Sequence, residues 1–283
     1  LMLSASLLAL ATAAEAAGRV ALVIGNGAYQ SQSKLTNPGN DAEDVAALLT
    51  RVGFTVIEGR DLDFEGLRRK RLEFSEKLRE MTDEAEANPG GPQPVALFYY
   101  SGHGIQVDGK NYVVPVDAKL ERPGDELNYA VNLEAILREM NHPSRATVVI
   151  LDACRDNPFA KSMARSIGGG KTRAAESSEP VGGLAQIKSS KGSIIIYATE
   201  PDNVALDGDD RNSPFTRAFL THAPTPGVDL IHLMRRIGAD VLHATQSRQV
   251  PWLSFALDTP PVVLADEGVV QQAALVTGAP QIG

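Results

Sequence analysis

Two side chains of this sequence have the types and the spacing for nucleophilic catalysis. Cys154 is the only cysteine in the 283 residues and ends the apolar run VVILDAC. His103 ends a similar run, VALFYYSGH, about 50 residues earlier, which suits a crossover between two parallel strands. A thiol attacks as a thiolate when a base lies beside it, and histidine is such a base. A lone cysteine is often only a small buried apolar side chain, but these surroundings favour catalysis by Cys154 and His103.

Backbone groups next to these two residues predict an oxyanion hole. Gly104 follows His103 directly, and its lack of a side chain leaves the backbone N–H uncrowded. We expect this N–H and that of Cys154 to stabilise the oxyanion of a tetrahedral intermediate.

Strands and helices alternate along the chain and predict an α/β fold. Buried strands are expected at 19–25, 54–59, 95–104, 145–154 and 193–199, and an edge strand is expected within 249–257. Helices are expected at 40–53, 64–81, 129–141, 213–223 and 228–247. This order predicts a mostly parallel sheet with helices on both faces. The carboxyl ends of such strands border the functional crevice, where we expect His103 and Cys154.

The chain is expected to divide into a leader, one domain and a tail. Residues 1–17 have the apolar stretch and small-residue sites of a cleaved signal peptide, with a retained anchor or an ordinary helix as alternatives. A cleaved signal predicts export to the periplasm or the extracellular space, with no integral membrane segment left. Residues 18–258 form the predicted domain, in which 160–191 is a long flexible loop. Residues 259–283, which begin with prolines and are weakly patterned, form the expected tail.

Charge and motif spacing exclude several other functions. The formal net charge of −8 disfavours a nucleic-acid partner and favours a cationic substrate. A glycine-rich sequence at 24–30 lacks the third glycine of a dinucleotide site, since Gln30 stands there. A second one, at 167–172, lacks the first glycine of a phosphate loop, and no strand precedes it. The other histidines show no metal-ligand spacing.

Several motifs, in order, resemble the caspase-like cysteine peptidases, particularly bacterial metacaspases and the related paracaspases. They are VALVIGNGAY, the NDA of residues 40–42, SGHGIQVDGKNY, DACRDNPF, YATEPDNVALDGDDRNSPFT and RQVPW, and they extend from about Arg19 to about Leu257. The sequence departs from the caspase signature around the cysteine, because Asp152 and Asp156 replace its glutamine and glycine. The resemblance implies a caspase-like three-layer sandwich and a cysteine endopeptidase with a Cys154–His103 dyad.

The same resemblance implies a preference for basic substrates. The position of Asp152 lines the pocket for the P1 side chain in caspases, which cleave after aspartate. An acid there would repel aspartate and pair with Arg or Lys. Asp41 and Asp207 correspond to further acids of this pocket, although Asp41 would also suit a helix start and Asp207 a turn. The expected partner is a protein or peptide with a basic P1 residue.

Self-cleavage and calcium are two further implications of the resemblance. Caspases mature by cleavage at the place of the 160–191 loop, which here offers six basic residues, although a merely solvated loop is the alternative. The dyad requires no cofactor. Many metacaspases use Ca²⁺, so an activating role stays open, although no calcium loop is recognisable. The principal competing hypothesis is a caspase-fold module that binds peptides with little turnover. A second alternative is acyl transfer by the same dyad to a non-peptide acceptor. The sequence predicts no oligomeric state.

Overall fold

The computed structural model describes residues 18–122, 124–154, 184, 187, 192–200, 205–257 and 259–266. The predicted signal peptide, most of the predicted 160–191 loop and the end of the chain lie outside the described residues. Within the described residues, no helix combines the length and the apolar composition that a membrane span needs. The strands are β1 (Arg19–Gly25), β2 (Thr55–Arg60), β3 (Val95–Val107), β4 (Lys110–Val113), β5 (Val131–Asn132), β6 (Ala146–Cys154), β7 (Ser193–Tyr197) and β8 (Trp252–Phe255). The helices are α1 (Pro38–Arg51), α2 (Phe64–Ala87), α3 (Glu126–Tyr129), α4 (Leu133–Met140), α6 (Pro214–His222) and α7 (Leu230–Ala244).

The central sheet has the order β2-β1-β3-β6-β7-β8. The pairings from β2 to β7 are parallel, and β8 is antiparallel to β7. β8 is therefore the edge strand that the sequence predicts, and the predicted α/β fold is confirmed. At the carboxyl end of β3, the chain turns back into β4 and then pairs with β5.

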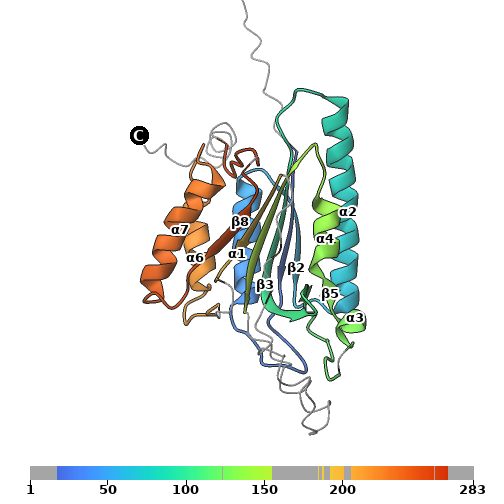
Figure 1. Cartoon of the computed structure of the whole chain (residues 1–283), viewed down its shortest axis with the longest axis vertical. Coiled ribbons are helices and arrows are strands. Elements are labelled where there is room, and N and C mark those ends of the chain that lie inside the picture. The colour runs from blue at the N-terminus through green and yellow to red at the C-terminus, as the bar shows by residue number, and fades with distance from the viewer. Residues whose placement is uncertain are drawn as a thin grey trace, which may run out of the picture.

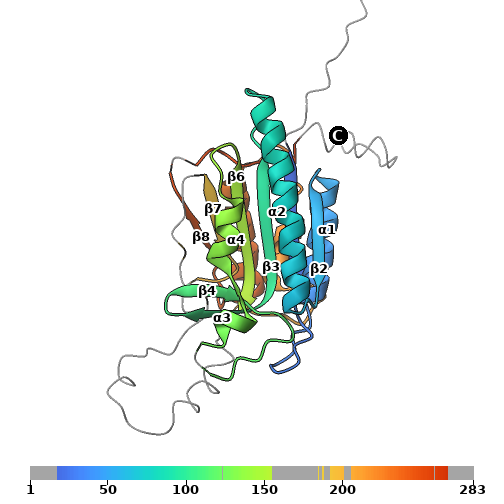
Figure 2. The ribbon, with the colours of Figure 1, turned by 90° about the vertical axis from the view of Figure 1, so that its right-hand side faces the viewer.

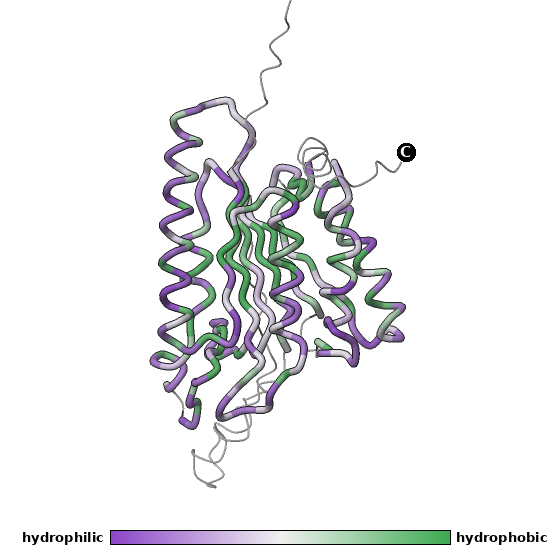
Figure 3. Tube along the Cα trace, turned by 180° about the vertical axis from the view of Figure 1, so that it is seen from behind, coloured by the Kyte–Doolittle hydropathy of each residue, from purple (hydrophilic) through white to green (hydrophobic). Residues whose placement is uncertain are grey.

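Alternate residues of the strands form two separate apolar cores, one on each face of the sheet. Ala21 and Val23 of β1 pack with α1, α6 and α7, whereas Val20, Leu22 and Ile24 pack with α2 and α4. Figure 1 shows α6 and α7 on one side of the sheet and α2 and α4 on the other, and Figure 2 shows α2 and α4 lying along the strands. The strands are the most hydrophobic part of the trace in Figure 3, as strands covered on both faces must be.

Several predicted boundaries differ from the structure. The helix expected to end at residue 81 continues to Ala87, and the strand expected to end at residue 104 continues to Val107. The helix expected at 129–141 begins at Leu133, because Val131 and Asn132 pair with β4 and the Asn132 side chain accepts the Ala135 N–H as an N-cap. The expected tail also begins too early. Val262 and Leu264 are buried in the core, and the Arg19 guanidinium donates to the Leu264 carbonyl and to the Asp266 carboxylate. The domain therefore continues to Asp266, past the prolines that suggested a break.

Residues at the end of the predicted 160–191 loop contact the sheet. Leu184 is buried in the α2–α4 core. The Ile187 N–H donates to the Tyr197 hydroxyl of β7 over 2.9 Å, and the Ile187 carbonyl accepts from Ser254 of β8. These two residues thus belong to the folded domain, and the rest of the predicted loop lies outside the described residues.

Candidate active site

His103 and Cys154 are neighbours across the sheet. They are register partners in the parallel pairing of β3 with β6, and Ser101 and Asp152 are register partners two residues earlier. Adjacent strands lie about 4.8 Å apart, so the backbones of His103 and Cys154 lie side by side at the carboxyl ends of the two strands. The predicted crossover therefore brings together the two residues that the sequence singled out.

The imidazole of His103 is buried, and one of its nitrogens contacts a backbone carbonyl. Its Nε2 lies 2.8 Å from the carbonyl oxygen of Ser33, in the segment between β1 and α1. A carbonyl only accepts hydrogen bonds, so Nε2 carries the proton of the neutral ring and Nδ1 is left as the basic nitrogen. The buried Nδ1 has no hydrogen-bond partner among the residues that the structure describes. The ring thus has the tautomer that a general base requires.

Burial and nearby polar groups act in opposite directions on the basicity of this ring. Burial lowers the pKa of His103 from its usual 6.5, while the Ser33 carbonyl and the charge of Asp207 raise it. Sequence reasoning missed Ser33, because a backbone carbonyl gives no residue-type signal.

Asp41 and Asp152 form a buried pair of carboxyl groups beside β3. Asp41 lies in the first turn of α1 and is 0% exposed, and Asp152 on β6 is 6% exposed. Ser213, which caps the start of α6, joins them: its N–H donates to Asp41 over 3.1 Å, and its hydroxyl donates to Asp152. Asp41 also accepts from the Ser101 hydroxyl and Asp152 from the Thr216 hydroxyl, over 3.1 and 2.8 Å. Asp41 therefore faces the sheet and is more than a helix-start acid.

Both carboxyl groups resist ionisation. Burial, followed by the charge of Asp152, raises the pKa of Asp41 from 3.8 to about 8. Burial also raises the pKa of Asp152 to about 6, although the hydrogen bonds from Ser213 and Thr216 lower it. The charge of Asp207 raises it further. Two like charges in one apolar setting favour retention of a proton. Near neutral pH the pair therefore holds a proton that an arriving cation would displace.

Asp207 lies near Asp152, and its carboxylate already accepts hydrogen bonds from backbone N–H groups. Its carboxylate accepts the N–H groups of Thr36 and Asn37, just before α1, over 2.8 and 3.4 Å. Together with Asp152 it borders a pocket of about 10 Å³, room for one water molecule. The structure thus brings Asp152 and Asp207 to one pocket, with Asp41 behind it. The other lining residues are Leu35, Pro38, Ser101, Gly102, Ala205, Leu206 and Ser213.

Gly104 lies directly beyond His103 and packs against the side chain of Leu184. A Cβ atom at this position would come within 2.8 Å of Cδ2 of Leu184. The lack of a side chain at Gly104 therefore lets Leu184 approach the backbone next to His103. This contact supports glycine at the position without testing the predicted oxyanion hole.

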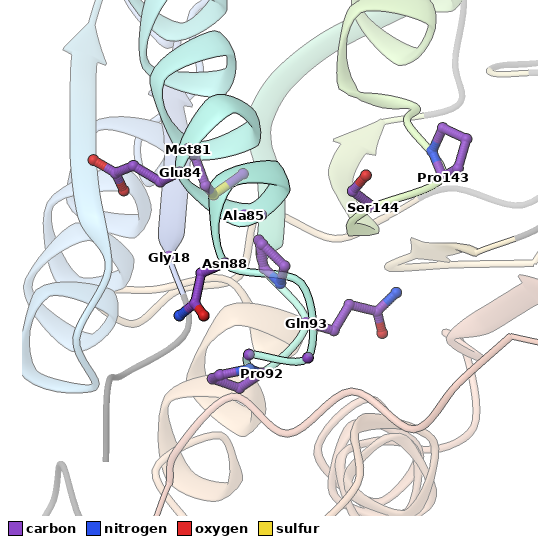
Figure 4. Close-up of a pocket in the computed structure, with 12 residues that line it drawn as sticks. Gly18, Met81, Glu84, Ala85, Asn88, Pro92, Gln93, Pro143 and Ser144 are labelled. Atoms are coloured by element: carbon purple, nitrogen blue, oxygen red, sulfur yellow. The ribbon is translucent and has the colours of Figure 1, made fainter. Parts of the chain in front are cut away.

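A larger cavity lies at the opposite end of the sheet. It measures about 340 Å³ and is bordered by Gly18, where β1 begins, and by the last turns of α2. Figure 4 shows Met81 and Glu84 of α2 on one side of it and Pro143 and Ser144 on the other. Since His103 and Asp152 are at the carboxyl ends of the strands, this cavity is not part of the candidate site.

The activating role of Ca²⁺ that the sequence left open stays a prediction. Among the described residues, no three His, Cys, Asp or Glu side chains form a group that could hold a metal ion. The acids near His103 are held by hydroxyl and N–H donors instead.

Comparisons with known proteins identify the family. The family model described as "Caspase domain" matches residues 18–260. The chain belongs to the caspase-domain family. Human mucosa-associated lymphoid tissue lymphoma translocation protein 1 is 29% identical over 137 residues, 48% of this chain and 15% of the relative, and the Mus musculus homolog matches equally. The chain thus matches only a small part of the length of these curated relatives.

Solved caspase structures share the fold. The structure of pro-sf-caspase-1 matches with a TM-score of 0.58 and 13% identity, covering 89% of this chain and 93% of the other. The structure of the Drosophila initiator caspase Dronc matches with a TM-score of 0.55 and 13% identity, covering 87% of this chain and 82% of the other. The predicted caspase-like sandwich is therefore confirmed. By its family, the chain is a caspase-like member of the cysteine peptidases.

Proposed function

We propose that the protein is a cysteine endopeptidase that uses Cys154 and His103 and cleaves after Arg or Lys. The buried pair of Asp41 and Asp152 beside the register partners His103 and Cys154 carries the proposal. Among the described residues, the hydrogen-bond donors to these carboxyls are hydroxyls, an amide side chain and a backbone N–H, none of them a cation. A substrate guanidinium or ammonium would supply the charge that this acidic site lacks.

The proposed reaction proceeds through an acyl-enzyme. Nδ1 of His103 takes the thiol proton of Cys154, and the thiolate attacks the scissile carbonyl carbon. The resulting oxyanion is stabilised by the backbone N–H groups of Gly104 and Cys154. The intermediate collapses when the imidazolium gives its proton to the leaving amine, which leaves a thioester. Water, deprotonated by His103, attacks the thioester, and the thiol recovers its proton as the carboxylic acid departs.

The acidic pocket explains the proposed specificity. An aspartate at P1 would place a third carboxylate beside Asp152 and Asp207 and would be repelled. Arg or Lys would instead place a positive charge beside these two acids. The pocket has room for one water in this conformation. Entry of a P1 side chain therefore requires this pocket to widen.

Covalent labelling tests the proposal directly. The full chain, with its thiol reduced, is treated with peptidyl acyloxymethyl ketones that differ only in carrying Arg or Asp at P1. We expect the Arg probe to add one mass increment at Cys154, the chain's only cysteine, and the Asp probe to react far more slowly. The variants Cys154→Ala and His103→Ala are the controls. Equal labelling by both probes would refute the specificity, and no labelling would favour a peptide-binding module with little turnover.

Self-processing is a second part of the proposal. The basic residues between 160 and 191 match the proposed specificity, and Leu184 and Ile187 anchor the end of this segment to the sheet. Incubation of the purified wild-type chain should yield two fragments whose new ends lie within 160–191. The same incubation of Cys154→Ala should yield none. Fragments that also form in Cys154→Ala would show that another protease cuts there.

Export is proposed from the first 17 residues alone. Their apolar stretch and small-residue sites match a signal peptide. Amino-terminal sequencing of the protein recovered outside the cytoplasm should give a start near Gly18. An unprocessed start in that fraction, or no protein there, would contradict export by a cleaved signal.

A further inference from the structure

Two tyrosine hydroxyls hold the backbone of His103 from both sides. The His103 N–H donates to the Tyr29 hydroxyl over 2.7 Å, and the Tyr100 hydroxyl donates to the His103 carbonyl over 2.8 Å. The two hydroxyl oxygens lie 3.3 Å apart, within hydrogen-bond reach of each other. Both polar backbone groups of the histidine are thereby held by one pair of side chains.

The ring of Tyr29 also contacts the imidazole itself. The two ring centroids are 4.3 Å apart and the planes are inclined at 39°. Tyr29 is 2% exposed, so its ring is enclosed by the fold. An aromatic face next to an imidazole favours the protonated, cationic ring. His103 takes this form once it has accepted the proton of a thiol.

The surrounding chain is built to admit these contacts. Gly102 has a φ of +150°, and a Cβ atom there would lie 2.7 Å from the Tyr29 hydroxyl and 2.8 Å from that of Tyr100. The segment that carries Tyr29 also supplies the Ser33 carbonyl to Nε2. It is braced where Asp61 accepts the N–H groups of Gly27 and Ala28, both over 2.8 Å.

We propose that Tyr29 is a positioning residue, whose hydroxyl and ring hold the imidazole of His103 in the orientation that presents Nδ1 to Cys154. The proposal rests on the proposed function of the dyad. The Ser33 carbonyl contacts only the far nitrogen of the ring, whereas Tyr29 contacts both the backbone and the face of the imidazole. A displacement of about 1 Å at a reacting group costs up to 100-fold in rate, so loss of the hydroxyl should slow the chemical step.

Removal of one hydroxyl tests this role in the full chain. Tyr29→Phe keeps the ring and deletes the hydroxyl, and with it the acceptor for the His103 N–H and the contact with the Tyr100 hydroxyl. Tyr197→Phe is the matched control, because the Tyr197 hydroxyl is as deeply buried and also accepts a backbone N–H, from Ile187 over 2.9 Å. We expect Tyr29→Phe to lower kcat on an Arg-P1 peptide by about 10- to 100-fold, with KM within about twofold. Tyr197→Phe should stay within about twofold of the wild type in both constants.

The alkylation rate of Cys154 provides a readout that does not depend on turnover. Iodoacetamide reacts with the thiolate, and Cys154 is the only cysteine, so the rate at pH 7 reports how well His103 removes its proton. This rate should fall about tenfold or more in Tyr29→Phe and stay unchanged in Tyr197→Phe. Thermal melts of both variants identify any unfolded fraction, so a loss of stability is not mistaken for a loss of positioning.

The outcomes separate this proposal from the proposed function. A wild type that hydrolyses the peptide, with Tyr29→Phe matching Tyr197→Phe in kcat and alkylation rate, overturns the role of Tyr29 alone. A wild type that neither hydrolyses the peptide nor is alkylated faster than glutathione overturns the dyad and this proposal with it. If Tyr29→Phe does not fold, Tyr100→Phe takes its place, since it removes the donor to the His103 carbonyl and the same two losses are expected.

Discussion

Asp41 and Asp152 approach each other from α1 and β6, and a single residue, Ser213, donates a hydrogen bond to each of them. The two carboxyls are buried together. Burial and the charge of Asp152 raise the pKa of Asp41 to about 8, and burial and the charge of Asp207 raise the pKa of Asp152 to about 6. Isolated buried carboxylates are costly. Their burial together, from α1 and β6, supports the proposed role in binding positive charge, which leads to the following predictions.

Loss of the Asp152 carboxylate should abolish most of the recognition of basic substrates. We expect Asp152→Asn to lower kcat/KM for Arg- and Lys-P1 peptides by about 100-fold or more, because a buried cation would lose its counter-charge. The amide oxygen still accepts from Ser213 and Thr216, so the fold should persist. Asp83→Asn on the exposed side of α2 changes the net charge equally and is the control. Similar activities in the two variants would refute the role of Asp152.

The contribution of Asp41 should grow with pH. Since the pKa of Asp41 is raised to about 8, Asp41 is largely protonated at pH 6.5, where an amide imitates it well. Profiles of kcat/KM report the free enzyme, so the wild-type value for an Arg-P1 peptide should rise between pH 6 and 8. The deficit of Asp41→Asn should be small at pH 6.5 and about tenfold or more at pH 9. A deficit that does not change with pH would contradict this assignment.

Stability should depend on pH in the opposite direction. A carboxyl whose pKa rises from 3.8 in the unfolded chain to about 8 in the folded one binds a proton on folding between these values. The stabilisation is complete below pH 4 and is lost as the pH rises to 8. Thermal melts of the wild type from pH 5 to 8 should therefore show a falling Tm, by roughly 2–4 °C for each kcal/mol lost. Asp41→Asn should flatten this dependence; an unchanged slope would mean that other groups cause it.

Gly102 should tolerate no side chain. Its φ of +150° disfavours other residues, and a Cβ atom would meet the Asn26 carbonyl and the hydroxyls of Tyr29 and Tyr100 within 3.0 Å. We expect Gly102→Ala to lower the free energy of unfolding by about 1–3 kcal/mol, measured by urea denaturation. Gly39→Ala in the first turn of α1, where nothing lies within 4 Å, is the matched control and should be neutral or slightly stabilising. Equal effects of the two substitutions would contradict the contacts described here.

Strand and helix patterns predicted the sheet and the two strand ends well, because buried parallel strands are continuous apolar runs. The strand at 19–25 has its predicted bounds, and the register partners His103 and Cys154 follow from the crossover between β3 and β6. The resemblance to caspases also named Asp41 and Asp152, which the fold brings to one place from positions more than 100 residues apart.

Interactions through the backbone could not be predicted in the same way. The Ser33 carbonyl and the hydrogen bond from the His103 N–H to Tyr29 depend on the path of the segment after β1, which residue types do not specify. The bridging role of Ser213 depends on how α6 docks beside α1. The boundary at 258 was wrong because two prolines suggested a break, whereas the buried Leu264 continues the core.

Hydrolysis of fluorogenic peptides that differ only at P1, carrying Arg, Lys or Asp, tests the proposed peptidase activity and its specificity most directly. The thiol is reduced, and the assay is run with and without calcium. The full chain is compared with Cys154→Ala. We expect cleavage after Arg or Lys, none after Asp, and no cleavage by Cys154→Ala. Cleavage after Asp would contradict the assignment of the acidic pocket, and absence of hydrolysis across the whole panel would contradict the peptidase itself.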